Sequence, residues 1–132
     1  MLRYIEKENK KLGFKYKDYY LPQGDSFTFT ATEQGTAPIE GQPTIERVVF
    51  KLGLKHGECD INSVYEQDYL NNDDGTIWFC KVSGEVTKSW KTTCQCDDEP
   101  YVYEIEVIYS DGEPVTLTSG GFTIEPQIIG GE

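Results

Sequence analysis

The chain has 132 residues, which is long enough for one domain with a substantial hydrophobic core. Its formal net charge of −11 argues against general nucleic-acid binding, because a surface that binds phosphates needs a basic patch. Aromatic residues make up 13% of the sequence, so its composition is not that of a disordered protein.

The sequence also lacks the features of a membrane-directed chain. No apolar run approaches the ~18 residues that a spanning helix needs. The first residues contain no apolar stretch of about seven or more, which a signal peptide would have. We therefore expect synthesis in a cytoplasm, with neither a membrane nor a nucleic acid as a partner.

Positive charge is concentrated near the N-terminus. Residues 1–18 have a net charge of +3, which leaves −14 on the remainder of the chain. Such a segment suits docking on an acidic neighbour, for example the body of another copy, although a solvated tail is the simpler alternative. We predict an extended N-terminal arm over residues 1–20, within which the alternation of Phe14, Tyr16 and Tyr20 could form a first short strand. The candidate interface residues are Arg3, Tyr4, Ile5, Phe14, Tyr16, Tyr19 and Tyr20, with Trp90 as a further candidate from the body.

The next residues, 21–127, form a predicted domain of short strands separated by turn signals. Apolar and polar residues alternate with period two in several segments, which predicts strands with one buried face. The segment 76–82 is apolar on both faces, so we expect a central strand covered on both sides. The predicted strands cover residues 26–32, 45–54, 61–70 (a strand or an irregular segment), 76–82 and a hairpin at 101–126, with loops or turns at 33–43 and 71–75.

The hairpin at 101–126 has the clearest pattern. Its first strand alternates tyrosine, isoleucine and valine with glutamate, and Asp111-Gly112 tolerates the backbone of a tight turn. The return strand is expected to place Val115 and Leu117 inward. The parity of its apolar residues then changes across Gly120-Gly121, which predicts a β-bulge or a strand break there.

Residues 83–100 have the weakest pattern. Val86 and Trp90 are four positions apart, so we expect at most one helical turn. A polar loop is expected before the hairpin, and residues 128–132 are expected to form a tail. With six or seven strands, the chain is predicted to be all-β, as an antiparallel immunoglobulin-like β-sandwich with an extended N-terminal arm. A small barrel is the alternative.

The four cysteines have no spacing that defines a site. Without a signal peptide we expect reduced thiols, and Cys80, within a predicted strand, is expected to be a small buried hydrophobe. Cys94 and Cys96 together with Cys59 or His56 could bind zinc. A structural zinc site usually has two C-x₂₋₄-C pairs, however, and this chain has a single C-x-C pair and isolated cysteines. Free thiols are favoured over a disulfide, and a disulfide over zinc.

Catalytic and calcium sites are also poorly supported. The single histidine, His56, lies beside no nucleophile motif such as G-x-S-x-G. The acidic pairs at 73–74 and 97–99 lack the spaced pattern of a calcium loop. We therefore predict a protein that is not an enzyme and has no cofactor. Trp78, Trp90 and the pair Tyr19-Tyr20 are the aromatic residues that could stack on sugars if they are exposed. Of these, Trp78 is expected in the core instead.

A set of patterned segments lies at Gly24–Phe29, Val48–Leu52, Tyr101–Ile105, Asp111-Gly112, Val115–Leu117 and Gly121–Ile124 with Pro126. Together they resemble the small immunoglobulin-like domain of phage tail and baseplate proteins, best known as the N-terminal domain of the baseplate upper protein of siphophages that infect Gram-positive bacteria. The resemblance covers roughly residues 22–127. Two features depart from it, namely the longer stretch at 86–100 and the basic arm.

The resemblance implies a virion structural protein that docks on other virion proteins in multiple copies, on the tail, the baseplate or the head. It transfers no catalytic residues. The alternative function is a carbohydrate- or cell-surface-binding sandwich module that uses Trp90 or loop tyrosines. A fold alone does not decide between these functions, because sandwiches serve many roles.

Overall fold

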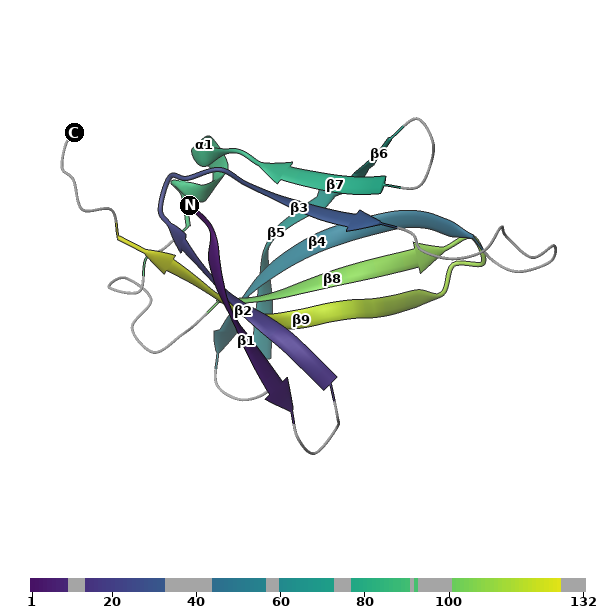
Figure 1. The fold of residues 1–132 in the computed structure, drawn as a ribbon, viewed down its shortest axis with the longest axis horizontal. Coiled ribbons are helices and arrows are strands. Elements are labelled where there is room, and N and C mark those ends of the chain that lie inside the picture. Colours follow the sequence, from purple (N-terminus) through teal and green to yellow (C-terminus); the bar gives the residue numbers. More distant parts are fainter. Residues whose placement is uncertain are drawn as a thin grey trace.

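The computed structural model describes residues 1–9, 14–32, 44–56, 60–72, 77–90, 92 and 101–126. The loop expected at 33–43 and the tail expected at 128–132 lie outside the described residues. Within the described residues the chain forms nine strands and one short helix. In chain order these are β1 (Arg3–Asn9), β2 (Phe14–Pro22), β3 (Phe27–Thr32), β4 (Ile45–His56), β5 (Asp60–Asp68), β6 (Leu70–Asn71), β7 (Ile77–Val82), α1 (Gly84–Thr87), β8 (Tyr101–Tyr109) and β9 (Pro114–Glu125), as Figure 1 shows.

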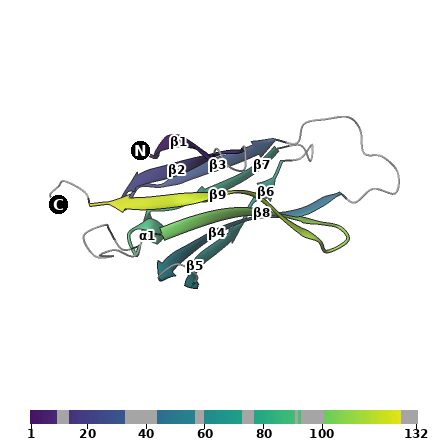
Figure 2. The same ribbon diagram turned by 90° about the horizontal axis from the view of Figure 1, so that it is seen from below.

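The strands form two sheets that lie one above the other (Figures 1 and 2). The larger sheet has the strand order β1-β2-β9-β8-β4-β5, and the smaller has the order β3-β7-β6. Neighbouring strands run antiparallel, except that β2 and β9 are parallel. The prediction of an all-β, mainly antiparallel sandwich is therefore confirmed.

The core lies between the two sheets and is rich in aromatic rings. Phe27 of the smaller sheet packs on Phe50 and Phe122 of the larger sheet, with ring centroids 5.8 and 5.4 Å apart. These separations are typical of favourable aromatic pairs. The predicted alternation is confirmed in β3, β4 and β8, whose buried residues include Phe29, Val48, Leu52, Tyr103, Ile105 and Val107.

The hairpin between β8 and β9 turns where the sequence predicted. Gly112 has a φ of 89° and its amide donates to the Tyr109 carbonyl at 2.9 Å. The Tyr109 amide in turn donates to the Glu113 carbonyl at 3.1 Å, and Asp111 Oδ1 accepts from the Glu113 amide at 3.0 Å. A left-handed glycine after a type I turn is a common three-residue hairpin connection, so Asp111-Gly112 is confirmed as the turn.

The position of the predicted bulge was wrong. Ile105 pairs with Thr118 and Glu106 with Thr116, so the extra residue on β9 is Leu117 rather than a glycine. Val115 lies opposite Val107 and is therefore on the core face as predicted, although it is exposed. Leu117 is the extra residue and is exposed, so its predicted inward position was wrong. The parity change seen in the sequence is therefore produced by Leu117, three residues before Gly120.

The strand β7 is central in hydrogen bonding but is not covered on both sides. It pairs with β3 and with β6, and its burial alternates, with Trp78, Cys80 and Val82 inward. Ile77 and Phe79 are 38% and 36% exposed, so the prediction of two covered faces was wrong. Its outer apolar residues lie beside the threonines of β3 instead of beneath another layer.

The helical turn expected around Val86 is present. Ser83 caps α1, with its side-chain oxygen accepting from the Val86 amide at 3.4 Å. The Trp90 amide donates to the Thr87 carbonyl at 3.1 Å, which continues the turn and directs the indole inward. Val86 packs partly buried against the same core.

The strands β1 and β2 belong to the larger sheet, whereas the sequence predicted an extended arm over residues 1–20. β1 pairs along its whole length with β2, from Arg3 opposite Tyr20 to Asn9 opposite Phe14. β2 then joins β9 in parallel. The pairing of β2 with β9 joins positions about 100 residues apart, so the local sequence pattern does not specify it.

Candidate docking surface

The strands β1 and β2 form a two-stranded ribbon at one edge of the larger sheet (Figure 1). β2 pairs with β9 only over Tyr19–Pro22, whereas its pairing with β1 covers Phe14–Tyr20. Among the described residues, the half of the ribbon formed by Phe14–Asp18 and its partners on β1 therefore pairs with no third strand. A two-stranded hairpin is marginally stable alone in water, so contacts at its base matter.

The base of the ribbon is fixed to β8 and β9 by two hydrogen bonds. Asp18 Oδ1 accepts from the Gly121 amide at 2.8 Å, and the Tyr103 hydroxyl donates to the Lys17 carbonyl at 2.7 Å. A Cβ atom on Gly120 would lie 2.5 Å from that same carbonyl oxygen. The two glycines thus leave the room that β2 needs to approach β9.

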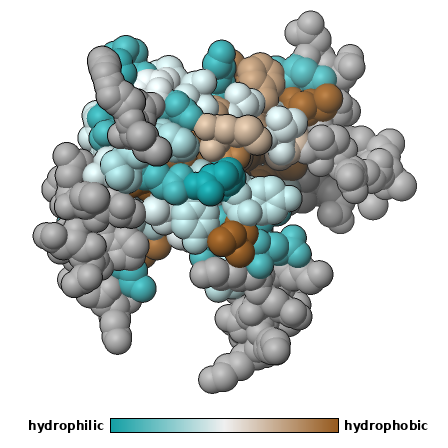
Figure 3. Space-filling view, turned by 60° about the vertical axis from the view of Figure 1, so that its left-hand side comes forward, coloured by the Kyte–Doolittle hydropathy of each residue, from teal (hydrophilic) through white to brown (hydrophobic). Residues whose placement is uncertain are grey.

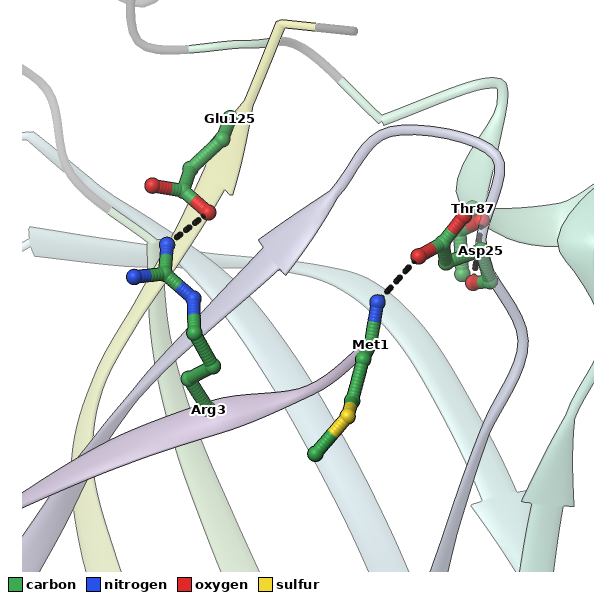
Figure 4. Close-up of polar contacts among 5 residues, drawn as sticks. All are labelled: Met1, Arg3, Asp25, Thr87 and Glu125. Carbon is green, nitrogen blue, oxygen red and sulfur yellow. Dashed lines mark hydrogen bonds and ion pairs between the residues drawn. The ribbon is translucent and has the colours of Figure 1, made fainter.

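The free edge of the ribbon is held at its N-terminal end by two ion pairs (Figure 4). The Met1 amino group pairs with Asp25, and the Arg3 guanidinium pairs with Glu125 at the end of β9. The Glu125 carboxylate raises the pKa of Arg3. The Asp25 carbonyl also accepts from the Thr87 hydroxyl at 2.9 Å, which connects this corner to α1.

Tyr4, Tyr19 and Lys17 form a small cluster on one face of the ribbon. The rings of Tyr4 and Tyr19 have centroids 5.9 Å apart, and Lys17 Nζ lies 4.5 Å from the centroid of the Tyr4 ring. This distance is within the range of a cation–π contact. On the other face, the Arg3 guanidinium lies 6.0 Å from the centroid of the Tyr20 ring.

Tyr19 connects this cluster to the core. Its ring contacts those of Phe29, Tyr103 and Phe122, with centroids 4.9, 5.3 and 6.1 Å away. Burial, with a smaller contribution from the neighbouring Tyr103 and Tyr4, raises the pKa of Tyr19 to about 12. Tyr19 is therefore an anchor of the ribbon and offers little of its surface to a partner.

The candidate interface residues divide by their exposure. Tyr4 and Ile5 are 55% and 53% exposed, whereas Tyr16 and Tyr20 are half-buried. The side chain of Phe14 lies outside the described residues, although its backbone is in β2. The structure thus brings seven of the eight candidates onto one ribbon, and Tyr4 and Ile5 are the most exposed apolar residues among the ribbon side chains that it describes.

Trp90 is the candidate that the structure removes. It is only 2% exposed and packs edge-on against Tyr65 and Phe122, with ring centroids 5.5 and 6.0 Å away. The Gln23 side-chain amide donates a hydrogen bond to the Trp90 carbonyl at 2.8 Å, which ties the residue after β2 to the segment after α1. Trp90 is a core residue, and its prediction as an interface or sugar-stacking residue was wrong.

The described residues carry no evident reaction chemistry. Cys80 is a buried free thiol, as expected, and burial raises its pKa to about 11. Cys59, Cys94 and Cys96, the acidic stretches at 73–74 and 97–99, and the side chain of His56 lie outside the described residues. No group of three or more potential metal ligands comes together in the part of the chain that the structure describes.

On the face that Figure 3 shows, apolar exposure is spread over small areas. Figure 3 shows one face on which hydrophilic colours predominate and brown areas are small and separate. No helix among the described residues is long and apolar enough to cross a membrane. The ribbon edge is therefore a more defined candidate for contact than any single large apolar patch on the face in view.

Sequence reasoning missed the residues that hold the ribbon. Asp18 and Glu125 carried no local signal, because their partners are more than 100 positions away. Gly120-Gly121 was noticed, but it was interpreted as a bulge. Tyr4 and Ile5 of β1 and the tyrosines of β2 were among the predicted interface residues, because they lie in the basic N-terminal segment.

Comparisons with known proteins give no family. No protein-family model and no curated protein matches the chain. Among solved structures, the chain is similar to one titled "Structure or murine CRIg", with 10% sequence identity over 96% of this chain and 98% of that chain and a TM-score of 0.38. A likeness at this level carries no argument about function. The two packed sheets described above are what place the chain among all-β sandwiches.

Proposed function

We propose that this chain is a non-enzymatic structural protein of a bacteriophage particle, which docks in several copies on the tail, the baseplate or the head. Docking occurs through the β1–β2 ribbon. The observation that carries the proposal is the half of the ribbon that pairs with no third strand among the described residues. A folded domain that exposes such an element has a ready site for another chain.

The physical basis is the free edge of β1. An edge strand presents unpaired backbone amides and carbonyls, and a neighbouring chain can add a strand to it. Exposed Tyr4 and Ile5 on this strand supply apolar contact area beside those backbone groups. β1 is paired with β2 along its whole length, so its outer edge is already formed, and the Arg3–Glu125 ion pair joins it to the end of β9.

The assignment to a phage particle comes from the sequence resemblance. The segments that carry it lie in β3, β4, β8 and β9 and in the turns beside them; β4, β8 and β9 are interior strands of the larger sheet, and β3 is an edge strand of the smaller sheet. Repeated sites are general in symmetric assemblies, so several copies are expected. Trp90 is buried, so the carbohydrate-binding alternative loses its main candidate for stacking on a sugar.

The test uses particles purified from a culture that carries the gene. Mass spectrometry and antibody-gold labelling should find the chain in the particles, in several copies each. The variant Ile5→Lys places a charge on the free edge, a device that natural edge strands use against pairing. It should be produced and folded but depleted from particles at least tenfold.

The matched control is Val115→Lys, which changes an exposed apolar residue near the β8–β9 turn. This variant should enter particles as the unchanged protein does. Deletion of the first 18 residues is a poor test, because it removes Tyr4 and most of β2 and uncovers the edge of β9. Absence of the unchanged chain from purified particles would contradict the proposal.

A further inference from the structure

The smaller sheet ends at β3, on the side where the ribbon lies. Among the described residues, β3 pairs with β7 and with no strand along its other edge. β7 lies toward β5, because the Gln67 side chain donates to the Lys81 carbonyl at 2.8 Å. Phe29 of β3 instead contacts Tyr19 of β2, with ring centroids 4.9 Å apart. The unpaired edge of β3 therefore faces the ribbon.

The core-facing side of β1 lies beyond that edge and is left uncovered. Tyr4 is directly opposite Tyr19 in the β1–β2 register, and directly opposite residues point to the same face of a sheet. Tyr19 points into the core, where its ring contacts those of Phe29 and Tyr103. Tyr4 therefore has the orientation of a core residue, yet it is 55% exposed. The space beside β3 and above the ribbon is thus an open strand position, which no strand of the described residues fills.

A cavity of about 290 Å³ lies beside this open strand position. Its lining comes from the ribbon, β3, β8 and β9, and it includes Phe29, Ala31, Ile105 and Leu117. Leu117, the extra residue of the β9 bulge, is 57% exposed, so part of this apolar lining is in contact with water. A cavity of ~150 Å³ in another protein accepts a benzene molecule. The cavity beside β3 is therefore large enough for one bulky apolar side chain.

The polar groups of the cavity favour an uncharged occupant. The Tyr103 hydroxyl already donates to the Lys17 carbonyl at 2.7 Å, and Lys17 Nζ lies 4.5 Å from the centroid of the Tyr4 ring. Glu6 lies opposite Lys17 in the β1–β2 register, so the charges of the two side chains offset each other. Complementarity of charge therefore favours an uncharged occupant over a basic, an acidic or a phosphorylated one. The unpaired edge of β3 favours a strand over a free small molecule, because a strand satisfies its backbone amides and carbonyls.

We propose that an extended, uncharged segment of a partner protein adds to the edge of β3, covers Tyr4 and places one bulky apolar side chain in the cavity. In such contacts, backbone hydrogen bonds supply affinity and a side-chain pocket supplies selectivity. Side chains on one face of a strand recur at every second residue, about 6.6 Å apart. A segment with apolar residues at alternate positions can therefore contact the cavity and Tyr4 with the same face. This site goes beyond the proposed function, because it lies at β3 and does not depend on a virion role.

The test uses the full chain and a synthetic peptide of this chemistry. In the peptide, threonine alternates with valine around a central phenylalanine, and a lysine at one end and a glutamate at the other keep it soluble and without net charge. Isothermal titration calorimetry measures binding, and amide hydrogen exchange of the protein locates it. The peptide should bind and should slow exchange in β3 at least tenfold at saturation, because the added strand occupies the open edge.

Ala31→Leu is the decisive variant, because it fills the cavity from a half-buried, core-facing position on β3. It should weaken binding of the peptide at least tenfold, as should serine in place of the central phenylalanine of the peptide. The matched control, Thr28→Leu, adds an apolar side chain to the exposed face of the same strand and should bind the peptide as the unchanged protein does. Thermal unfolding verifies that both variants fold. Leu117→Ser, which removes an exposed part of the lining, replaces an Ala31→Leu protein that does not fold.

Several results would overturn this inference. They are no binding of the peptide at millimolar concentration, binding that leaves exchange in β3 unchanged, or an Ala31→Leu protein that binds the peptide as tightly as the unchanged one. If N-acetylphenylalanine amide bound as tightly as the peptide, the cavity would be a site for a small aromatic ligand and not for a strand. If light scattering showed a dimer whose β3 amides were already protected, the occupant would be a second copy and not a partner protein.

None of these results bears on the proposed function. Incorporation into particles and its loss in Ile5→Lys concern the edge of β1 and are measured separately. Conversely, a chain that is absent from particles but binds the peptide at β3 would refute the virion role and leave the strand site in place.

Discussion

The carboxylate of Asp18 accepts a hydrogen bond from the amide of Gly121 at 2.8 Å, although the two residues are 103 positions apart. The parallel pairing of β2 with β9 begins one residue later, at Tyr19 opposite Phe122. The Asp18 side chain therefore extends the hydrogen-bond ladder between β2 and β9 by one position. Beside it, the Lys17 carbonyl accepts a hydrogen bond from the Tyr103 hydroxyl. Asp18 thus marks where the ribbon leaves the sheet.

Removing this carboxylate should loosen the ribbon. We expect Asp18→Ala to lower the free energy of unfolding by about 1–3 kcal/mol, because a partly buried amide loses a charged acceptor. Asp18→Asn keeps an acceptor oxygen and should lose less. Urea unfolding measures both values, and a stability of Asp18→Ala equal to that of the unchanged protein would show that water replaces the contact without cost.

The two neighbouring glycines should differ in their tolerance of alanine. A Cβ on Gly120 would lie 2.5 Å from the Lys17 carbonyl oxygen, which is backbone, whereas one on Gly121 would lie 3.3 Å from the Asp18 carboxylate, a side chain that can adjust. We expect Gly120→Ala to cost roughly 2 kcal/mol or more, as overpacking does. Gly121→Ala is the matched control.

The same urea titrations compare the two glycine variants. The larger loss should be in Gly120→Ala, and amide hydrogen exchange should rise in β1 and β2 first, because these strands depend on the approach of Lys17 to β9. Equal losses in the two variants would contradict the role given to this close approach.

Trp90 should be among the most sensitive positions of the core. It is 2% exposed and its ring contacts those of Tyr65 and Phe122. Truncation of a buried aromatic residue to alanine costs about 3–5 kcal/mol, so Trp90→Ala is expected to be at the limit of folding. Trp90→Phe should fold with a smaller loss, and near-ultraviolet circular dichroism with urea unfolding measures both.

Local alternation was sufficient to predict much of the sandwich, and the reason is visible in β8. Its tyrosines, Ile105 and Val107 face the core while glutamates face outward, so burial imposes the period of two directly on the sequence. The turn at Asp111-Gly112 is local in the same way. These features depend on residues close together in the chain.

The ribbon could not be predicted from such patterns. Its pairing with β9, the contact of Asp18 and the space at Gly120 all join positions about 100 residues apart. Trp90 was misjudged for a related reason. Flanking lysines indicate an exposed residue, whereas its burial depends on the distant rings of Tyr65 and Phe122.

Cys80 should be unreactive in the folded protein. Its side chain is 1% exposed, and burial raises the pKa of the thiol to about 11, so the reactive thiolate is scarce at neutral pH. We expect iodoacetamide to modify Cys80 at least a hundredfold more slowly in native buffer than in urea. Mass spectrometry of the peptide that contains Cys80 gives both rates, and equal rates would contradict the buried position.

Stability should fall in alkaline solution, and Tyr19 should contribute to the fall. Its pKa is raised from 10.0 to about 12, chiefly by burial, so the folded protein holds the phenol proton more tightly than the unfolded chain. That contribution is fully present below pH 10 and is lost as the pH rises toward 12. The urea midpoint should therefore decline over this interval. Tyr19→Phe removes the titrating group and should make the decline shallower, whatever its effect at neutral pH. Identical slopes for the two proteins would show that the Tyr19 phenol is as accessible to water in the folded ribbon as in the unfolded chain.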